Sequence, residues 1–401
     1  MSRNPMFQPQ NRPARSSLSR RGLLRGAGLG GAGLALPGLL TACGTPSSRQ
    51  TAEECVSTDR SAEEKELMFS NWPEYIDRKK KRMPTLEDFE ERTGIEVTYN
   101  ADVNDNTDFF AKIQNQLGDC QPIGRDIFVL SDWMVPMLVG LGWLQELDHD
   151  NMPNVRANML PRLSSPSYDP DREYSVPWQS GMTGIAYNAK YTGEDSSFEE
   201  LLTRADLKNK VSLLTELDDT MGFMLRMGGA DPDDFGDAEW DEAIDRLEGY
   251  VAQGRIRRFT GNDYLDDLLA GNIVACEAWS GDVIAAQYDN PDIKFVVPEE
   301  GVSIWSDEML VPNRAEHKTN AELLMDHYYD PEVAARLAAW VNYICPVAGA
   351  EKAMEKVDPS LVGNRLIFPD EQMLSQAWEF QSIDDDTRRR YQGDFRRAMS
   401  A

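Results

Sequence analysis

The 401-residue sequence has few histidines and lacks the short motifs of several common enzyme classes. Its three histidines, His149, His317 and His327, are scattered through polar segments. No Gly-x-Ser-x-Gly, His-Glu-x-x-His or Gly-x-x-x-x-Gly-Lys segment occurs, which argues against an esterase, a zinc protease or a P-loop enzyme. The five cysteines lack zinc-site spacing. We therefore predict a protein that is not an enzyme and has no cofactor and no metal.

Basic residues are also scarce, with 41 Lys and Arg against 68 Asp and Glu, for a net charge of −27. Because phosphate contacts need basic patches, this balance argues against a nucleic-acid partner. An acidic cleft would accelerate the approach of a cationic ligand. The same acidity also favours solubility, so net charge alone does not decide between these interpretations.

Only one long apolar run is present, and it lies in an N-terminal segment with the pattern of an export signal. Residues 19–25 have a twin-arginine pattern, residues 26–40 are rich in Gly, Ala and Leu, and small residues precede Cys43. This is how a bacterial lipoprotein signal looks, with the cysteine acylated and residues 1–42 removed. We predict a lipid-anchored, extracytoplasmic protein exported by the twin-arginine route, with a polar tether at 43–64. A plain export signal or an uncleaved anchor is the alternative.

Four cysteines remain after Cys43. Cys55 and Cys120 lie in polar, loop-like segments, whereas Cys276 and Cys345 lie in apolar runs. Disulfides persist in oxidising compartments. Four cysteines allow three connectivities. We predict a disulfide between Cys55 and Cys120, which would attach the tether to the first part of the folded chain, and buried thiols at the other two positions.

Strand and helix patterns alternate along the rest of the chain, which indicates an α/β sheet covered on both faces. About 340 residues remain beyond the tether, which exceeds a usual single core and predicts two lobes. Thr85 is expected to cap one helix and Asp330 another. Strands are expected at 67–72, 95–99, 126–130, 211–214 and 273–279, and helices near 84–93, 109–117, 134–141, 240–251 and 264–269 and from 331 onward.

Tryptophans and polar or acidic residues coincide where several expected strands end. Ligands of open α/β sheets bind outside the carboxyl ends of strands, so these loops can converge on one cleft. An aromatic face attracts an ammonium group, and a carboxylate gives it a charge-assisted hydrogen bond. Tryptophans flanked by acids therefore suit a long, multiply charged cation, namely a polyamine. The residues are Trp72 with Glu74, Ser131 with Trp133, Trp279 with Asp282, and Trp305 with Asp307.

At these residues the sequence resembles the bacterial extracellular binding proteins for spermidine and putrescine, from about Leu67 to the C-terminus. The matching segments are Asn71-Trp72-Pro73-Glu74-Tyr75, Val129-Leu130-Ser131-Asp132-Trp133, Trp279-Ser280-Gly281-Asp282, Pro298-Glu299-Glu300-Gly301 followed by Trp305-Ser306-Asp307, Asn342-Tyr343 and Glu379-Phe380-Gln381. The resemblance implies ligand-binding roles for Tyr75, Tyr343 and Gln381 as well. It also implies an acid at Asp218 or Asp219, where the register departs from the family and leaves both open.

The resemblance implies a type II periplasmic-binding-protein fold, in which two α/β lobes are joined by crossing hinge strands and close on the ligand. We expect lobe 1 to comprise 65–181 and 305–343, and lobe 2 to comprise 182–304 and 344–401. The expected partners are a polyamine (spermidine or putrescine), an ABC permease with its ATPase, and the membrane through the lipid; we expect a monomer.

Two other interpretations remain open. The first is the same fold with another solute, such as a different organic amine, a sugar or a metal. The second is a secreted hydrolase that uses two of the acids, which predicts turnover of a substrate.

Overall fold

The computed structural model describes residue 55, residues 57–194 and residues 196–401. The predicted signal at 1–42, Cys43 and most of the predicted tether lie outside the described residues. The strands are β1 (Glu66–Asn71), β2 (Glu96–Ala101), β3 (Ile127–Ser131), β4 (Ser175–Asn188), β5 (Val211–Leu214), β6 (Ile256–Thr260), β7 (Ala275–Trp279), β8 (Ile293–Val296), β9 (Val302–Leu310) and β10 (Ala377–Trp378).

Helices alternate with these strands, and short 3-10 turns follow several of them, among them η2 (Asp132–Met134) directly after β3. The α-helices are α1 (Pro84–Thr93), α2 (Asn106–Gly118), α3 (Val135–Gly140), α4 (Pro153–Asn158), α5 (Phe198–Thr203), α6 (Leu217–Met227), α7 (Asp237–Ala252), α8 (Tyr264–Ala270), α9 (Ser280–Asp289), α10 (Lys318–Tyr328), α11 (Pro331–Val341), α12 (Ala350–Val357), α13 (Glu371–Leu374) and α14 (Asp385–Ala398).

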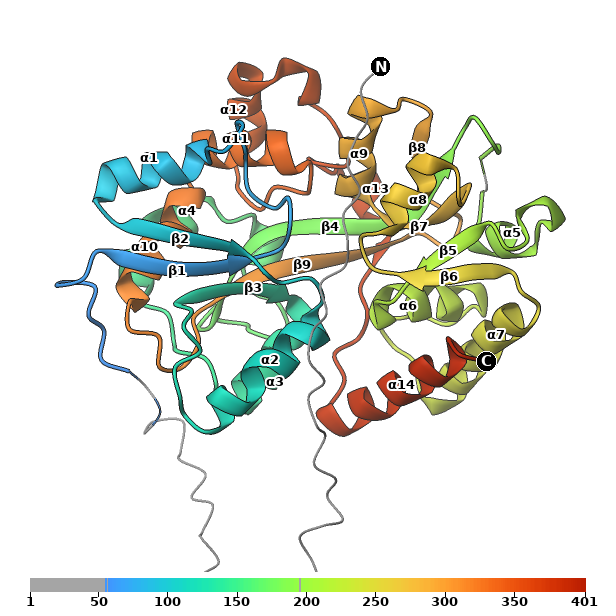
Figure 1. The fold of residues 1–401 in the computed structure, drawn as a ribbon, viewed down its shortest axis with the longest axis horizontal. Helices are drawn as coiled ribbons and strands as arrows, with labels where there is room; N and C mark the ends of the chain where they lie inside the picture. Colours follow the sequence, from blue (N-terminus) through green and yellow to red (C-terminus); the bar gives the residue numbers. More distant parts are fainter. Residues whose placement is uncertain (1–54, 56, 195) are drawn as a thin grey trace, which may run out of the picture. The chain divides into compact units, whose positions relative to one another are not determined.

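The strands form one mixed sheet in the order β2-β1-β3-β9-β4-β7-β5-β6, with β10 paired to β9 and β8 to β4. The long strands β4 and β9 are antiparallel neighbours in its middle (Figure 1). On one side β1 runs parallel to β2 and β3. On the other side β5 runs parallel to β6 and β7. The predicted α/β fold is therefore confirmed, with a parallel group of strands on each side of a central antiparallel pair.

Of the two predicted helix N-caps, one is present in the structure and the other is not. Asp330 caps α11, since its carboxylate accepts hydrogen bonds from the backbone N–H groups of Glu332 and Val333, and this prediction is confirmed. The prediction that Thr85 caps α1 is wrong, because the helix begins one residue earlier, at Pro84. Proline is favoured at a first helical position, and the Thr85 hydroxyl instead donates to the buried carboxylate of Asp77.

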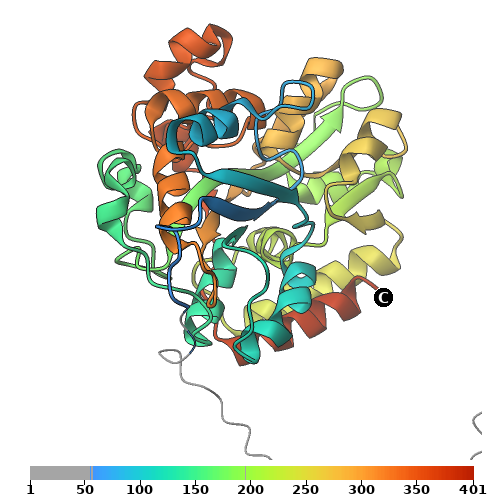
Figure 2. The same ribbon diagram turned by 60° about the vertical axis from the view of Figure 1, so that its left-hand side comes forward.

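Two large hydrophobic cores flank the central strands. The first gathers β1–β3 with α1, α10, α11 and α12, and α1 and α11 lie side by side (Figure 2). The second gathers β5 and β6 with α5, α6, α7 and α14. The chain between Cys345 and Ile367 packs in the first core, whereas Trp378 and Tyr391 pack in the second. The last part of the chain therefore contributes to both cores.

The cysteines that the structure describes follow the predicted pattern. A disulfide joins Cys55 to Cys120, with their Cα atoms 5.5 Å apart, and so attaches the chain before β1 to the end of α2. Cys276 and Cys345 are buried free thiols. Within the described ranges, every helix is too short or too polar to cross a membrane.

Candidate ligand-binding site

A cavity of about 590 Å³ opens where strands from both sides of the sheet end. It lies beyond the carboxyl ends of β1, β3, β5 and β7, the position that open α/β sheets use for ligands. The structure brings all the predicted ligand-binding residues to its wall. They are Trp72, Glu74, Tyr75, Ser131, Trp133, Asp218, Asp219, Trp279, Asp282, Trp305, Asp307, Tyr343 and Gln381.

The aromatic residues of the wall form a connected series of rings. The rings of Tyr75 and Tyr343 lie 5.3 Å apart, those of Tyr343 and Trp305 5.6 Å, and those of Trp305 and Trp279 6.4 Å. The indole N–H of Trp305 donates to the Thr183 hydroxyl at 2.9 Å, which fixes the ring. Such a series offers both apolar area for a methylene chain and ring faces for cations.

One glycine allows the Trp305 ring to lie against the central strand. Gly181 is the β4 partner of Trp305 on β9. A Cβ atom built at Gly181 would lie only 2.3 Å from Cζ2 of Trp305. The indole therefore packs directly on the glycine backbone, and any side chain at this position would displace it.

Asp307 is a buried carboxylate held only by neutral groups. It projects from β9 two residues after Trp305, so the two side chains share a face of the strand. The Tyr75 hydroxyl donates to Asp307 at 2.8 Å and the Ser131 hydroxyl donates at 2.7 Å. Burial raises the pKa of Asp307 to about 7, and these hydrogen bonds only partly oppose that shift.

Asp282 is held in the same way from the other side of the cavity. The hydroxyls of Tyr264 and Tyr343 each donate to it at 2.8 Å, and the Asn262 amide donates at 3.2 Å. Burial raises the pKa of Asp282, and these hydrogen bonds oppose the shift. Tyr264 is not among the residues that line the cavity. Although it opens one of the segments that resemble the family, the sequence offered no reason to assign it a role, because that role depends on its hydrogen bond to Asp282.

Asp219 and Asp218, between which sequence reasoning did not choose, have different partners. Asp219 accepts a 3.1 Å hydrogen bond from the Trp279 indole N–H, and burial raises its pKa to about 6. Asp218 is ion-paired with Arg388 of α14. Both acids line the cavity, but only Asp218 has a cationic partner in the structure.

Sequence reasoning also missed Glu216, which precedes α6 and lines the cavity. Burial, together with the negative charges of Asp105 and Asp219, holds the pKa of Glu216 well above its ordinary value. Glu216 belongs to the same acidic stretch as Asp218 and Asp219, but only its position two residues after the end of β5 shows that it faces the cavity. Gln381 also lines the wall, although its amide N–H donates to the Phe235 carbonyl at 3.0 Å.

Negative charge dominates the cavity. Among the described residues that line it, Arg388 is the one basic side chain. The ten acids of the wall are Glu74, Asp132, Glu216, Asp218, Asp219, Asp282, Asp289, Asp307, Asp358 and Glu379. Buried acids without cationic partners are costly to ionise, so a cavity of this kind stabilises a bound cation.

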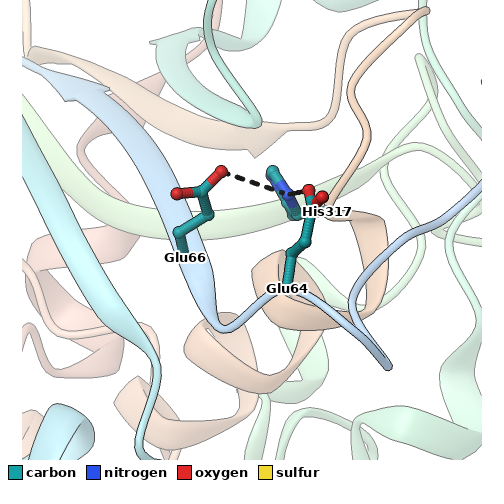
Figure 3. Close-up of side chains that lie close together, drawn as sticks. All are labelled: Glu64, Glu66 and His317. Atoms are coloured by element: carbon teal, nitrogen blue, oxygen red, sulfur yellow. Dashed lines mark hydrogen bonds and ion pairs between the residues drawn. The ribbon is translucent and has the colours of Figure 1, made fainter.

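A different group of acids, around His317, is balanced by the protein's own cations (Figure 3). Nε2 of His317 lies 3.0 Å from Glu64 and 3.7 Å from Glu66, and Nδ1 lies 3.1 Å from Asp126. Arg60 is also ion-paired with Glu64. Within the described ranges, Glu64, Glu66 and His317 are the one group close enough to hold a metal ion.

Burial lowers the pKa of His317, but its hydrogen bonds to Glu64 and Asp126 have the opposite and larger effect. The pKa of His317 therefore lies above the usual 6.5. When protonated, the imidazole offsets part of the negative charge of the acids around it. This cluster attaches the chain before β1 to the start of α10, where His317 is the N-cap residue. We therefore interpret it as a structural ion-pair network.

The fold and the cavity are those of a solute-binding protein, and comparison with known proteins shows the family. Residues 85–360, more than half of the chain, match the bacterial extracellular solute-binding protein family, and the chain belongs to it. This is a family of solute-binding transport proteins and not of enzymes, so the prediction of a non-enzymatic protein is confirmed.

The relatives are polyamine-binding proteins. Spermidine/putrescine-binding periplasmic protein 1 of Haemophilus influenzae is 25% identical, over 85% of this chain and 90% of its own length. The putrescine-binding periplasmic protein PotF of Escherichia coli is 28% identical, over 73% and 80%. Among solved structures, the ABC transporter substrate-binding protein PotD of Streptococcus pneumoniae superposes with a TM-score of 0.69 at 23% identity, over 84% of this chain and 99% of that chain.

Proposed function

We propose that this protein is the lipid-anchored substrate-binding component of an ABC importer, and that it binds a polyamine in the cavity and delivers it to a membrane permease. Spermidine and putrescine are the proposed ligands. The relatives named above bind such amines, and the chain shares their family. The permease is driven by an ATPase, and the lipid on Cys43 would raise the local concentration of the protein near it.

One observation supports the proposal most directly. Asp219 and Asp307 are buried, and Asp282 is partly buried, beside a series of aromatic rings, and hydroxyl, amide and indole groups hold them without a cationic partner. Burial raises the pKa of each of these carboxyls. Ammonium groups of a ligand would supply the missing charge, and the rings would cover the methylene chain between them.

Calorimetric titration of the purified protein with putrescine, spermidine and spermine, at low and at physiological salt, tests the ligand class. We expect one-to-one binding of at least one of them. Butane-1,4-diol, which has the chain of putrescine without its charges, is the matched control and should give no heat. Absence of binding with all three amines would contradict the polyamine assignment while leaving the fold unchanged.

The proposed anchor and export route are tested in cells. We expect labelled palmitate to be incorporated into the wild-type protein and not into Cys43→Ser, which should move from the membrane fraction to the soluble fraction. Arg20→Lys combined with Arg21→Lys should block export, since the twin-arginine pair is what the route recognises. Export of that double variant at the wild-type level would contradict the twin-arginine route.

We further propose that two lobes close over the ligand about β4 and β9, as the predicted division at 181/182 and 304/305 requires. In the predicted division, lobe 2 resumes at residue 344. Because residues 345–367 pack in the first core and Trp378 packs in the second, we propose that the chain enters the second lobe after residue 367. Small-angle X-ray scattering tests this closure. We expect the radius of gyration to decrease when polyamine is added, and an unchanged value would contradict hinge closure.

A further inference from the structure

Arg388 occupies a place in the cavity wall that matches what an ammonium group of a ligand requires. It lies in the first turn of α14, and its guanidinium group is ion-paired with Asp218 of α6. Its Cζ atom lies 4.7 Å from the centre of the Trp133 ring and 5.8 Å from that of Phe380. One cation thus contacts a carboxylate and two aromatic rings.

This arrangement is shielded from water. The Arg388 side chain is 11% exposed and the Asp218 side chain is 19% exposed. A cation–π contact and a charge-assisted hydrogen bond are both stronger when desolvated than on an open surface. The predicted ligand-binding pair Trp133 and Asp218 is therefore already engaged by a cation that belongs to the protein.

Arg388 also separates the cavity from a neighbouring hollow. A second hollow, of about 600 Å³, shares Trp133, Pro136, Ser382, Ile383 and Arg388 with the main cavity. These shared residues form the wall between the two spaces. A shorter, uncharged side chain at position 388 would leave Asp218 and the face of Trp133 open at that end of the cavity.

We infer that Arg388 is a specificity-determining residue: it fills one cation subsite and so favours a diamine such as putrescine over spermidine, whose additional ammonium group is kept from the Asp218–Trp133 end. The inference rests on the proposed function. A further ammonium group of a longer polyamine would come close to the guanidinium group of Arg388, and the two positive charges would repel each other. A diamine has no third ammonium group, and it can use Asp219, Asp282 and Asp307 without approaching Arg388.

Titration of four proteins with putrescine and spermidine tests this role. Arg388→Met removes the charge and keeps a flexible apolar stem, whereas Arg388→Lys keeps the charge. Arg389→Met is the matched control, because Arg389 is the next residue of α14, is 68% exposed and pairs with Asp386 outside the main cavity. Circular dichroism and thermal melting establish that each variant is folded.

We expect the wild type to bind putrescine more tightly than spermidine. In Arg388→Met the affinity for spermidine should rise at least tenfold, while that for putrescine changes less than threefold. Arg388→Lys and Arg389→Met should keep the wild-type ratio of the two affinities. A ratio that Arg388→Met leaves unchanged, or an equal change for both amines, would overturn the inference while leaving polyamine binding established. If neither amine binds any folded variant or the wild type, the proposed function itself is wrong.

Discussion

Two neighbouring buried acids on β9, Asp307 and Glu308, differ in the groups that stabilise their negative charge. Their side chains point to opposite faces of the strand, and both are at most 5% exposed. Glu308 is ion-paired with the buried Arg172 at 2.9 Å. Asp307 has only the hydroxyls of Tyr75 and Ser131. Glu308 has its counter-charge within the fold, whereas Asp307 would gain one only from a bound cation.

The acids that we propose bind the ligand differ from the structural acids in their partners and not in their burial. Glu308, like the acids around His317, has a cation supplied by the protein. Asp219, Asp282 and Asp307 have none in the structure, and burial raises the pKa of each of them. A change at the first kind of acid should therefore affect folding, and a change at the second kind should affect binding.

The largest effect is expected at the structural acid. Glu308→Gln leaves the buried guanidinium of Arg172 without its counter-charge, and breaking such a pair costs about 3–5 kcal/mol of folding free energy. Urea denaturation measures it. Glu87→Gln is the matched control, since Glu87 pairs with Arg82 on the surface, where such pairs contribute about 1 kcal/mol or less. Equal stability losses in the two variants would contradict the comparison.

Asp307→Asn should affect binding instead. The variant removes a carboxylate that would face an ammonium group of the ligand, which costs about 2–5 kcal/mol of binding free energy. Folding stability should stay at or above the wild-type value, because the wild-type carboxylate is buried without a cation. Calorimetric titration and urea denaturation of the same preparation measure the two quantities. Unchanged polyamine affinity would remove Asp307 from the site.

Polyamine affinity should rise with pH between 5 and 8. With pKa values of about 6 and about 7, Asp219 and Asp307 are largely neutral at pH 5 and ionised at pH 8. The ligand's ammonium groups stay charged over this range, since alkyl amines such as the lysine side chain have a pKa of about 10. Ionisation of Asp219 alone should make binding about 10-fold tighter at pH 8 than at pH 5, ionisation of Asp307 alone about 100-fold, and both together up to about 1,000-fold. A pH-independent affinity would contradict the role of these acids.

The ligand-free protein should show the opposite trend. A carboxyl whose pKa is raised by folding holds its proton longer in the folded state, so its contribution to stability falls as pH rises from its unfolded value of about 4 to its folded value. The gain in melting temperature on adding polyamine should therefore be larger at pH 8 than at pH 5. Thermal melting at each pH, with and without ligand, measures the stability of the free protein and the rise in melting temperature on adding polyamine. A rise that becomes smaller at higher pH would contradict this linkage.

The smallest effect is expected where an aromatic ring is only displaced. Gly181→Ala pushes the Trp305 ring off the backbone of β4 and weakens one aromatic contact, which should cost about 0.5–2 kcal/mol of binding free energy. Gly140→Ala is the matched control, because a Cβ atom there would meet nothing within 4 Å. Calorimetric titration of both variants distinguishes them, and equal affinities would show that the position of the ring is unimportant.

Much of the fold and the cavity wall could be predicted because the signals are local. Trp72 and Trp133 come shortly after apolar strands and Trp279 ends one, as the sequence predicts. The expectation that Trp305 and Asp307 lie where a strand ends is wrong, because both lie inside β9. Strand ends on both sides of the sheet meet at one place, so residue type and position in the chain together locate these side chains.

The rest depends on pairings between distant segments that leave no pattern. Arg388, Arg389 and Arg390 form a run that looks like a solvated helix face, yet they pair with three different acids, Asp218, Asp386 and Asp237. Only the packing of α14 beside α6 and α7 selects which of the three arginines enters the cavity. The choice between Asp218 and Asp219 was open in the sequence for the same reason.

The bond between Cys55 and Cys120 closes the intervening chain into a covalent ring. A ring that is cut once remains one connected piece. The exposed lysines at positions 79, 80 and 81 lie within it, where a trypsin-like protease would cut. A molecule nicked there would therefore stay joined to its own N-terminal segment, and so to any lipid on that segment, until a reductant opened the disulfide.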